Sequence, residues 1–301
     1  MQSKTLSHLR QLEAESIFIL REAAAEFNKP VMLYSVGKDS AVMLRLAQKA
    51  FYPGKIPFPL LHIDTRFEFP EMIQFRDRYA QEVGVELIVH SNEQALREGA
   101  NPYSLGTQKC CSLLKTRALL DALASGGFDV AFAGARRDEE KSRAKERVYS
   151  FRDEQGQWDP KNQRPELWNL FNGRHRPGEN IRVFPLSNWT ELDIWFYICA
   201  ESIPLAPLYF AREREAVERG GGSVMLMQRG MRLLPGERPE MVKCRMRSLG
   251  CVPCSAAIRS DADTVPKIIA EMLAFRKSER HNVMGHEDEV ALEMKRREGY
   301  F

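Results

Sequence analysis

The chain has 301 residues, of which 44% are hydrophobic, so it can bury the core of one large domain or of two smaller ones. Its formal net charge of +3 is too small for nucleic acid or an anionic membrane surface to be the main partner. No apolar run approaches the roughly 20 residues that span a bilayer, and the charged N-terminus lacks the apolar core of a signal peptide. We therefore expect a cytoplasmic protein.

Along the chain, apolar residues at helical spacing between Leu9 and Phe27 predict an N-terminal helix that ends at Asn28-Lys29-Pro30. Short strand-like runs then alternate with amphipathic helices. The runs are VMLYS, PLLHID, VELIVH, FDVAFAGA and IRVFPLS. Such alternation predicts a parallel α/β sheet, and Thr190 is placed to cap the helix that follows the last run. Beyond residue 205, Gly, Pro and charged residues predict a loop-rich region.

Three of the predicted strands end in polar or flexible residues. In open α/β sheets, ligands bind outside the carboxyl ends of the strands, so these ends should share one crevice. Asp64 follows the second strand, and we expect it to touch a nucleoside or, through water, a metal ion. Gly134 and Arg136 follow the fourth strand.

The loop after the first strand predicts a phosphate site. Its six candidate residues are Ser35, Val36, Gly37, Lys38, Asp39 and Ser40. It is not a Walker A loop, because Asp39 follows Gly37-Lys38 and Met32 stands where that motif needs glycine. The amides of such a turn, the positive end of the helix dipole and the Lys38 charge bind anions. The alternative is an ordinary strand-to-helix turn, which the position at the end of the first strand disfavours.

A second candidate site is the charged segment 134–152, which has seven basic and four acidic residues, a local net charge of +3. The basic residues are Arg136, Arg137, Lys141, Arg143, Lys145, Arg147 and Arg152. Guanidinium groups pair two N–H donors with two oxygens, so a phosphate or sulfate pocket is one interpretation. A solvated charged helix is the other.

The phosphate loop resembles the Ser-Gly-Gly-x-Asp-Ser pyrophosphate loop of the adenine-nucleotide α-hydrolase-like (PP-loop) superfamily, with Val36 in place of the first glycine. Longer stretches resemble the small-subunit family of sulfate adenylyltransferase, and the likeness covers nearly the whole chain. These stretches are GARRDEEKSRAKER, SFRDEQGQWDPKNQRPELWNLFNGR and IRVFPLSNWTELDIW. Two C-terminal departures are LGCVPCSAA, where Ser255 and Ala256 replace the Thr-Gly of the family, and a tail without Ser-Met-Glu.

The resemblance implies that sulfate and ATP give adenosine 5′-phosphosulfate and pyrophosphate, in sulfate assimilation and with Mg²⁺ bound to ATP. Catalysis would then rest on Lys38, Asp39, Arg143 and Arg147. ATP and its pyrophosphate would be bound by Ser35, Val36, Gly37, Lys38, Asp39, Ser40, Asp64, Gly134 and Arg136.

It also implies a heterodimer with a GTPase large subunit, whose GTP hydrolysis would drive the reaction. Residues 1–205 would be the PP-loop ATP-binding catalytic domain, with the N-terminal helix as a cap, and 206–301 would dock the partner. The glycine-rich stretch 218–237 and the basic tail are the expected docking elements.

Six cysteines are too few for a disulfide scaffold. Cys251 and Cys254 have the spacing of half a metal site, and Cys110 with Cys111 would complete four ligands. Adjacent cysteines are poor simultaneous ligands of one tetrahedral ion, so we expect buried structural thiols and no metal site.

Features of the sequence also bear on three rival functions. A phosphoadenylyl sulfate reductase shares the fold but needs a C-terminal cysteine between Glu and Gly, which the end MKRREGYF lacks. A tRNA-thiolating enzyme would use paired cysteines, for which Cys110 and Cys251 are candidates. A non-catalytic nucleotide-binding subunit is disfavoured by the loop and the arginines.

Overall fold

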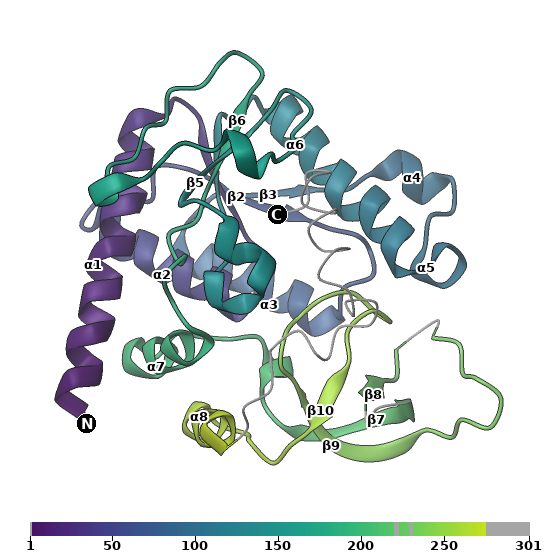
Figure 1. Ribbon diagram of the computed structural model, residues 1–301. Helices are drawn as coiled ribbons and strands as arrows, with labels where there is room; N and C mark the ends of the chain where they lie inside the picture. Colours follow the sequence, from purple (N-terminus) through teal and green to yellow (C-terminus); the bar gives the residue numbers. More distant parts are fainter. Residues whose placement is uncertain (1, 220–222, 229–230, 275–301) are drawn as a thin grey trace.

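The computed structural model describes residues 2–219, 223–228 and 231–274 (Figure 1). Six strands form one sheet in the order β3-β2-β1-β4-β6-β5. They are β1 (Pro30–Leu33), β2 (Leu60–Ile63), β3 (Leu87–His90), β4 (Val130–Phe132), β5 (Tyr149–Arg152) and β6 (Asn180–Val183). All neighbouring strands are parallel except β5, which pairs antiparallel with β6. The α/β fold with a parallel sheet is confirmed.

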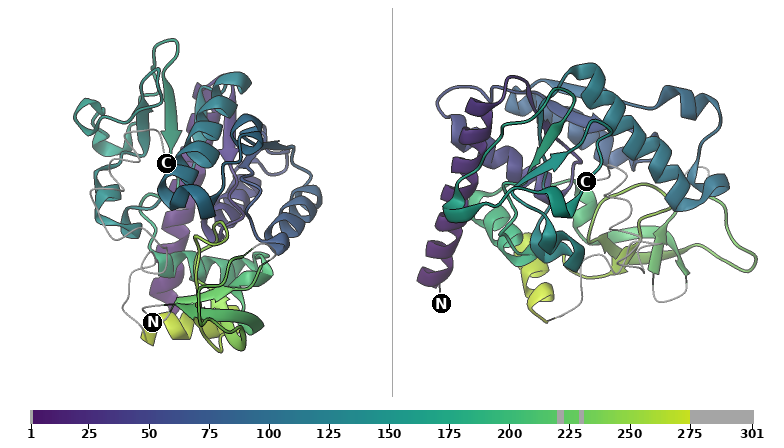
Figure 2. Two further views of the ribbon diagram at one scale, coloured as in Figure 1. Left: turned by 90° about the vertical axis from the view of Figure 1, so that its right-hand side faces the viewer. Right: turned by 45° about the horizontal axis from the view of Figure 1, so that its top comes forward.

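Helices cover both faces of the sheet (Figure 2). The helices of this part are α1 (Gln2–Glu26), α2 (Lys38–Phe51), α3 (Pro70–Val83), α4 (Glu93–Arg97), α5 (Pro102–Cys111), the π-helix η1 (Ser112–Arg117), α6 (Ala118–Gly126) and α7 (Glu191–Glu201). One large core joins side chains of α1, α2, α3 and α7 to one face of the sheet. A second core joins α6 to the other face.

Local signals explain where several helices begin and end. Pro70 is the first residue of α3, and Gly84, with a φ of 71°, ends it in the left-handed conformation. Thr190 caps α7 as expected: its hydroxyl accepts the Asp193 amide. The Asp193 carboxylate in turn accepts the Thr190 amide, which completes a capping box.

The basic segment does not form the long charged helix of the alternative interpretation. It folds into short 3₁₀ turns and the strand β5. The 3₁₀ turns between β4 and β6 are η2 (Arg137–Glu139), η3 (Lys141–Lys145), η4 (Pro160–Asn162) and η5 (Leu167–Asn169). These turns follow the carboxyl end of β4. Arg136, immediately before the first turn, therefore lies close to the phosphate loop.

The C-terminal region contains a small closed barrel as well as irregular connections. After η6 (Pro207–Tyr209), the barrel strands are β7 (Arg212–Arg219), β8 (Ser223–Leu226), β9 (Glu240–Met246) and β10 (Ala257–Arg259). The helix α8 (Val265–Ala274) follows and packs against α7. The sequence did not predict this barrel. Its strands are only three to eight residues long, and the glycines near them are more typical of loops than of a sheet. The expected docking tail lies outside the described residues. No helix among the described residues is long and apolar enough to cross a membrane.

Candidate functional site

The phosphate loop connects β1 to α2, with Gly37 at the N-cap position of the helix. The Ser40 hydroxyl donates to the Gly37 carbonyl at 2.9 Å, and the Gly37 amide donates to the Ser35 hydroxyl at 3.4 Å. Since Ser35 is exposed, its hydroxyl can meet a ligand beside the start of α2.

Val36 adopts a φ of 64°, in the left-handed region that a β-branched residue rarely occupies. Its side chain is buried in the main core. The valine that replaces glycine in the superfamily pattern therefore retains a glycine-like backbone, and core packing holds it there. Strained backbone of this kind concentrates at binding sites.

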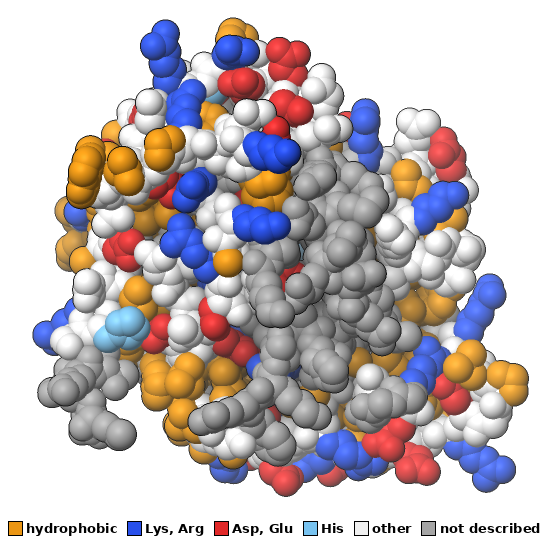
Figure 3. Space-filling view, in the orientation of Figure 1, with side chains coloured by type: hydrophobic (Ala, Val, Ile, Leu, Met, Phe, Trp, Pro, Cys, Tyr) orange, Lys and Arg blue, Asp and Glu red, His pale blue; other side chains and the backbone are white. Residues whose placement is uncertain are grey.

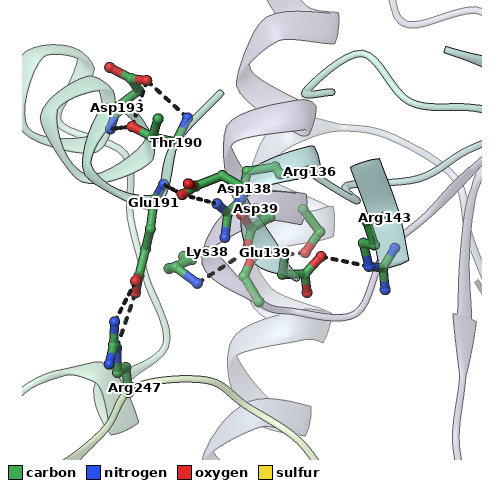
Figure 4. Close-up of polar contacts among 12 residues, drawn as sticks. Lys38, Asp39, Arg136, Asp138, Glu139, Arg143, Thr190, Glu191, Asp193 and Arg247 are labelled. Atoms are coloured by element: carbon green, nitrogen blue, oxygen red, sulfur yellow. Dashed lines mark hydrogen bonds and ion pairs between the residues drawn. The ribbon is translucent and has the colours of Figure 1, made fainter. Parts of the chain in front are cut away.

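Asp39 lies between two buried cations (Figure 4). The Lys38 ammonium is 3.2 Å from one carboxylate oxygen, and the Arg136 Nε is 2.6 Å from the other. Burial opposes ionisation of Asp39, but the charges of Lys38 and Arg136 outweigh it and hold the pKa of this carboxyl below its usual value. The site therefore holds a fixed carboxylate between two fixed cations at the start of α2.

Gly134 allows the end of β4 to lie against the phosphate loop. A β-carbon at this position would be 3.2 Å from the Asp39 β-carbon, which is tighter than nearly all such contacts. The structure thus brings together the loop 35–40, Gly134 and Arg136, which come from two different strand ends.

Arg143 and Arg147 have different surroundings. Arg143 is buried, with its Nε 3.0 Å from a Glu139 oxygen, and together with Arg136 it lines a narrow cavity that has no room for a water molecule. Arg147 is exposed. Burial raises the pKa of Glu166, and hydrogen bonds from the amides of Tyr149 and Val148 oppose this rise. The charges of Arg137 and Arg147 oppose it as well, so Arg147 lies near Glu166. The structure brings Arg143, but not Arg147, to the Arg136 cavity.

A second layer of buried arginines lies under Arg136 and Arg143, and one of its members, Arg182 on β6, was not predicted from the sequence. Glu146 accepts hydrogen bonds from Arg152 at 2.9 Å and from the Ser150 hydroxyl at 2.5 Å. Arg182, on β6 opposite Ser150, is fully buried, and none of its three nitrogens has a hydrogen-bond partner. Burial and the charge of Arg152 lower the pKa of Arg182 to about 9, although Glu146 opposes this shift.

Asp64 shapes the turn after β2. Its carboxylate accepts the Arg66 amide at 2.8 Å and lies 3.8 Å from Arg76. The turn borders a pocket with a cavity volume of about 80 Å³, whose polar lining includes Ser35, His62 and Glu68. Asp64 itself does not line this pocket.

His62 presents an acceptor at this pocket. Its Nδ1 lies 2.8 Å from the Tyr34 carbonyl oxygen, so Nδ1 carries the proton and donates, while the buried Nε2 has no partner. Burial lowers the pKa of His62, the bond to Tyr34 opposes this, and the charge of Arg76 adds to the lowering. The ring is therefore neutral near pH 7.

Residues from the C-terminal half complete the site, and no sequence pattern pointed to them. The Tyr209 hydroxyl, from η6, accepts the Lys38 amide at 2.8 Å. Arg247, after β9, is 2.7 Å from a Glu191 oxygen, and the Glu191 amide donates to Asp138 at 3.1 Å (Figure 4). In Figure 3, Lys and Arg side chains gather in the upper half of one face of the molecule.

Comparison with known proteins adds three findings. Residues 29–257 match the family model of the phosphoadenosine phosphosulfate reductase domain. Sulfate adenylyltransferase subunit 2 of Methylococcus capsulatus is 60% identical over 302 residues, covering 100% of both chains. The protein of the same name from Myxococcus xanthus is 60% identical over 296 residues, covering 98% of this chain and 97% of that one.

Among solved structures, Candida glabrata FMN adenylyltransferase, in complex with FMN and the ATP analogue AMPCPP, has a similar fold. The TM-score is 0.52 and the identity 15%, over 83% of this chain and 66% of that one. At this identity the likeness concerns the fold alone.

Proposed function

This chain belongs to the sulfate adenylyltransferase subunit 2 family of nucleotidyltransferases, and we propose that it transfers the adenylyl group of ATP to sulfate. A sulfate oxygen attacks the α-phosphorus, the bond between that phosphorus and the bridging oxygen of the β-phosphate breaks, and pyrophosphate leaves. The products are adenosine 5′-phosphosulfate and pyrophosphate. No protein nucleophile is needed, so catalysis rests on positioning and charge neutralisation.

The observation that carries this proposal is the placement of Asp39 between Lys38 and Arg136 at the start of α2. The helix amides and the hydroxyls of Ser35 and Ser40 would bind the β- and γ-phosphates. Lys38 would move from Asp39 toward the leaving pyrophosphate, while Asp39 keeps Arg136 directed at the loop. Apart from Lys38, these groups are held in place before the reaction, which is where electrostatic catalysis gains most.

Sulfate would be held by the buried arginines. Arg143 lines the narrow cavity beside Arg136, which would have to widen to admit sulfate, and the positive charge of Arg182 lies beneath without a hydrogen-bonded counter-ion. A dianion in this region would offset the cost of burying the guanidinium groups. Arg147, being exposed, would contribute long-range attraction rather than contact.

The residues fit a magnesium ion that arrives with ATP. No three carboxylate, His or Cys side chains in the described part of the chain could hold a metal ion by themselves. Mg²⁺ is usually bound through substrate phosphates and one or two carboxylates, and Asp39 is an ionised carboxylate within the loop itself. When bound, the ion neutralises charge on the leaving pyrophosphate.

The pocket beside Ser35 would take the nucleoside. Its walls are mostly apolar, as suits a purine ring, and His62 offers an unpartnered acceptor that fits the exocyclic amine of adenine. Asp64 would act by holding the turn that forms the rim of this pocket.

We further propose that the partner is a GTPase subunit and that GTP hydrolysis drives this unfavourable reaction. The chain has no Gly-x-x-x-x-Gly-Lys-Ser/Thr, so it carries no Walker-type site for GTP. Relatives carry the designation subunit 2 in their names, which supports a second chain.

The deciding experiment is exchange of labelled pyrophosphate into ATP, measured with and without sulfate. We expect exchange that depends on sulfate and is lost in Arg136→Gln. Exchange without sulfate would point to another adenylyl acceptor. Absence of exchange in the presence of a partner subunit and GTP would overturn the proposal.

A further inference from the structure

Four of the six cysteines lie in one place in the fold. The Thr65 hydroxyl is 3.2 Å from the Cys251 sulfur, and the Thr107 hydroxyl is 3.4 Å from the Cys254 sulfur. An isolated bridge pairs Glu68 with Cys251 and fixes this turn against the turn after β2. The Cys251-x-x-Cys254 turn, which follows β9, is therefore docked between the end of β2 and α5.

The other two cysteines lie on the helix that Cys254 contacts. Gly106, with a φ of 74°, kinks α5, so that Thr107 begins a second helical stretch. Residues three and four positions further along a helix lie on the same face, with β-carbons about 5–6 Å apart. Cys110 and Cys111 are those residues, so both follow Thr107, which contacts Cys254, by about one helical turn.

Burial and electrostatics agree with this geometry. Cys110, Cys251 and Cys254 are each no more than 7% exposed. Burial raises the pKa of Cys110 to about 12, and the thiols of Cys111, Cys251 and Cys254 add to the rise. Burial raises the pKa of Cys251 to about 11, while the Lys115 charge opposes it. Three buried thiols and the partly buried Cys111 thus lie in one region, with the Lys115 cation near it.

The arrangement favours a metal cluster over a single ion. Four thiolates around one zinc ion must approach to about 3.8 Å from each other, given zinc–sulfur bonds of about 2.3 Å. Adjacent helical residues point about 100° apart, so Cys110 and Cys111 meet this requirement poorly. Among the described residues, no three such side chains stand where one ion could be held. An iron–sulfur cluster presents a separate iron atom to each thiolate and accepts wider spacing.

We propose that Cys110, Cys111, Cys251 and Cys254 form a binding site for an iron–sulfur cluster. The four thiols lose their protons when the cluster binds, and Lys115 offsets part of the resulting negative charge. The spacing of the cysteines in the sequence disfavoured a metal site. It does not show that Thr107 contacts Cys254, which places Cys254 on the helix face of Cys110 and Cys111.

The site adjoins the nucleoside pocket without belonging to the phosphate loop. Gly250, immediately before Cys251, and Glu68, its bridge partner, both line that pocket, as does Lys115. A bound cluster would therefore stabilise one wall of the pocket. The cluster would be structural in this position, since no reacting atom of the proposed chemistry needs an electron.

The test is the metal content of the full-length chain, purified without oxygen and reconstituted with equal amounts of ferric and ferrous iron and with sulfide. We expect iron and acid-labile sulfide in equal amounts, about four of each per chain for a [4Fe–4S] cluster, with visible absorption that a reductant bleaches. Cys110→Ser and Cys254→Ser should each lower bound iron at least tenfold. Matched controls are Cys199→Ser, at an exposed thiol, and Cys244→Ser, at a buried thiol of the barrel; both should keep their iron.

Wild-type protein that binds no iron after reconstitution, or that holds one zinc ion instead, would overturn the proposal even where a variant fails to fold. Equal iron in ligand variants and controls would do the same. Pyrophosphate exchange, measured on the same samples, reports on the catalytic proposal separately.

Discussion

Asp39 illustrates how one side chain can organise a phosphate site. It is ionised because Lys38 and Arg136 outweigh the cost of its burial, and in return it keeps both cations within 3.2 Å. Removing the carboxylate would leave two buried like charges, and removing either cation would leave a poorly balanced carboxylate.

We expect Lys38→Ala and Asp39→Ala to keep the fold but to lower sulfate-dependent pyrophosphate exchange about 10²-fold or more, because preorganised phosphate contacts contribute several kcal/mol in the transition state. Exchange rates at saturating ATP, with circular dichroism as the fold check, measure this. Lys267→Ala, at an exposed ion pair on α8, is the matched control and should behave as wild type. Normal exchange in both loop variants would remove the loop from the site.

Substitutions at the two candidate catalytic arginines should have different effects on the response to sulfate. Arg143→Gln should weaken the response to sulfate at least tenfold more than it weakens ATP binding, because Arg143 is buried beside Arg136, whereas exposed Arg147→Gln should change either by less than about threefold. The KM for sulfate and the Kd for ATP of the two variants provide the comparison. Equal effects of the two substitutions would contradict the role proposed for burial.

His62 predicts a dependence of stability on pH. Its pKa is lowered in the folded chain from an ordinary value of 6.5, so below about pH 6.5 the unfolded chain binds a proton that the folded chain does not. The free energy of unfolding should therefore fall as the pH drops below 6.5, by up to about 1.4 kcal/mol per pH unit for this group. Urea titrations between pH 7.5 and 5 test this, and His62→Gln should show the shallower slope. Identical slopes would mean that His62 protonates freely when folded.

At the level of elements, the approach of β4 to the start of α2 is what assembles the site, and it depends on Gly134. The contact at 3.2 Å involves the Asp39 β-carbon, which cannot swing away as the end of a long side chain could. Any larger residue must shift β4 or the loop, and with it the Asp39–Arg136 pair.

Gly134→Ala should accordingly lower exchange about tenfold, and Gly134→Val should lower it further, because a misplacement on the order of 1 Å can cost up to about 10²-fold in rate. Thermal unfolding run in parallel should change much less than activity does. A Gly134→Val enzyme with unchanged exchange would indicate that the two elements can separate without harm.

Strands and helices of the sheet could be predicted because each has a local signal, such as Pro70 and Gly84 around α3 or the Thr190 cap of α7. The barrel was not predicted, because its strands are short and the sequence around them is rich in glycine. In the site, the loop 35–40 could be read from a contiguous motif. Tyr209 could not, because its contact with Lys38 joins residues 171 positions apart and depends on how η6 docks.

The same reasoning applies to the arginines. Charge density identified Arg136 and Arg143, but exposure, which decides between Arg143 and Arg147, depends on a 3₁₀ turn that charge patterning does not reveal. Arg182 lies in a strand pattern and was hidden by its apolar neighbours Ile181 and Val183.

At the scale of the whole molecule, two separate exposed apolar surfaces are available to a partner. Leu233 and Leu234, 43% and 55% exposed, lie in the stretch 218–237 that the sequence identified for docking. Trp168, 85% exposed, belongs to η5, between β5 and β6. Isolated exposed apolar residues are common, but grouped ones favour an interface.

We expect the double substitution Leu233→Ser and Leu234→Ser to weaken association with the proposed GTPase subunit at least tenfold, while Trp168→Ser leaves it unchanged. Calorimetry on the purified chains, and stimulation of exchange by GTP, provide the two measurements. The reverse pattern would move the docking surface to η5, and full GTP-independent turnover by the isolated chain would contradict the two-subunit arrangement.

A chain of polar contacts runs from the end of the barrel to the phosphate loop: Arg247 to Glu191, the Glu191 amide to Asp138, Asp138 to Arg136 at 3.7 Å, and Arg136 to Asp39. Thermodynamic linkage then sets a condition on any partner that shifts Arg247 when it binds the barrel. If that partner changes the affinity for ATP by some factor, ATP must change the affinity for the partner by the same factor. Measuring the Kd of the complex with and without ATP would therefore reveal communication between subunits without any turnover, and Arg247→Gln should bring the two Kd values together.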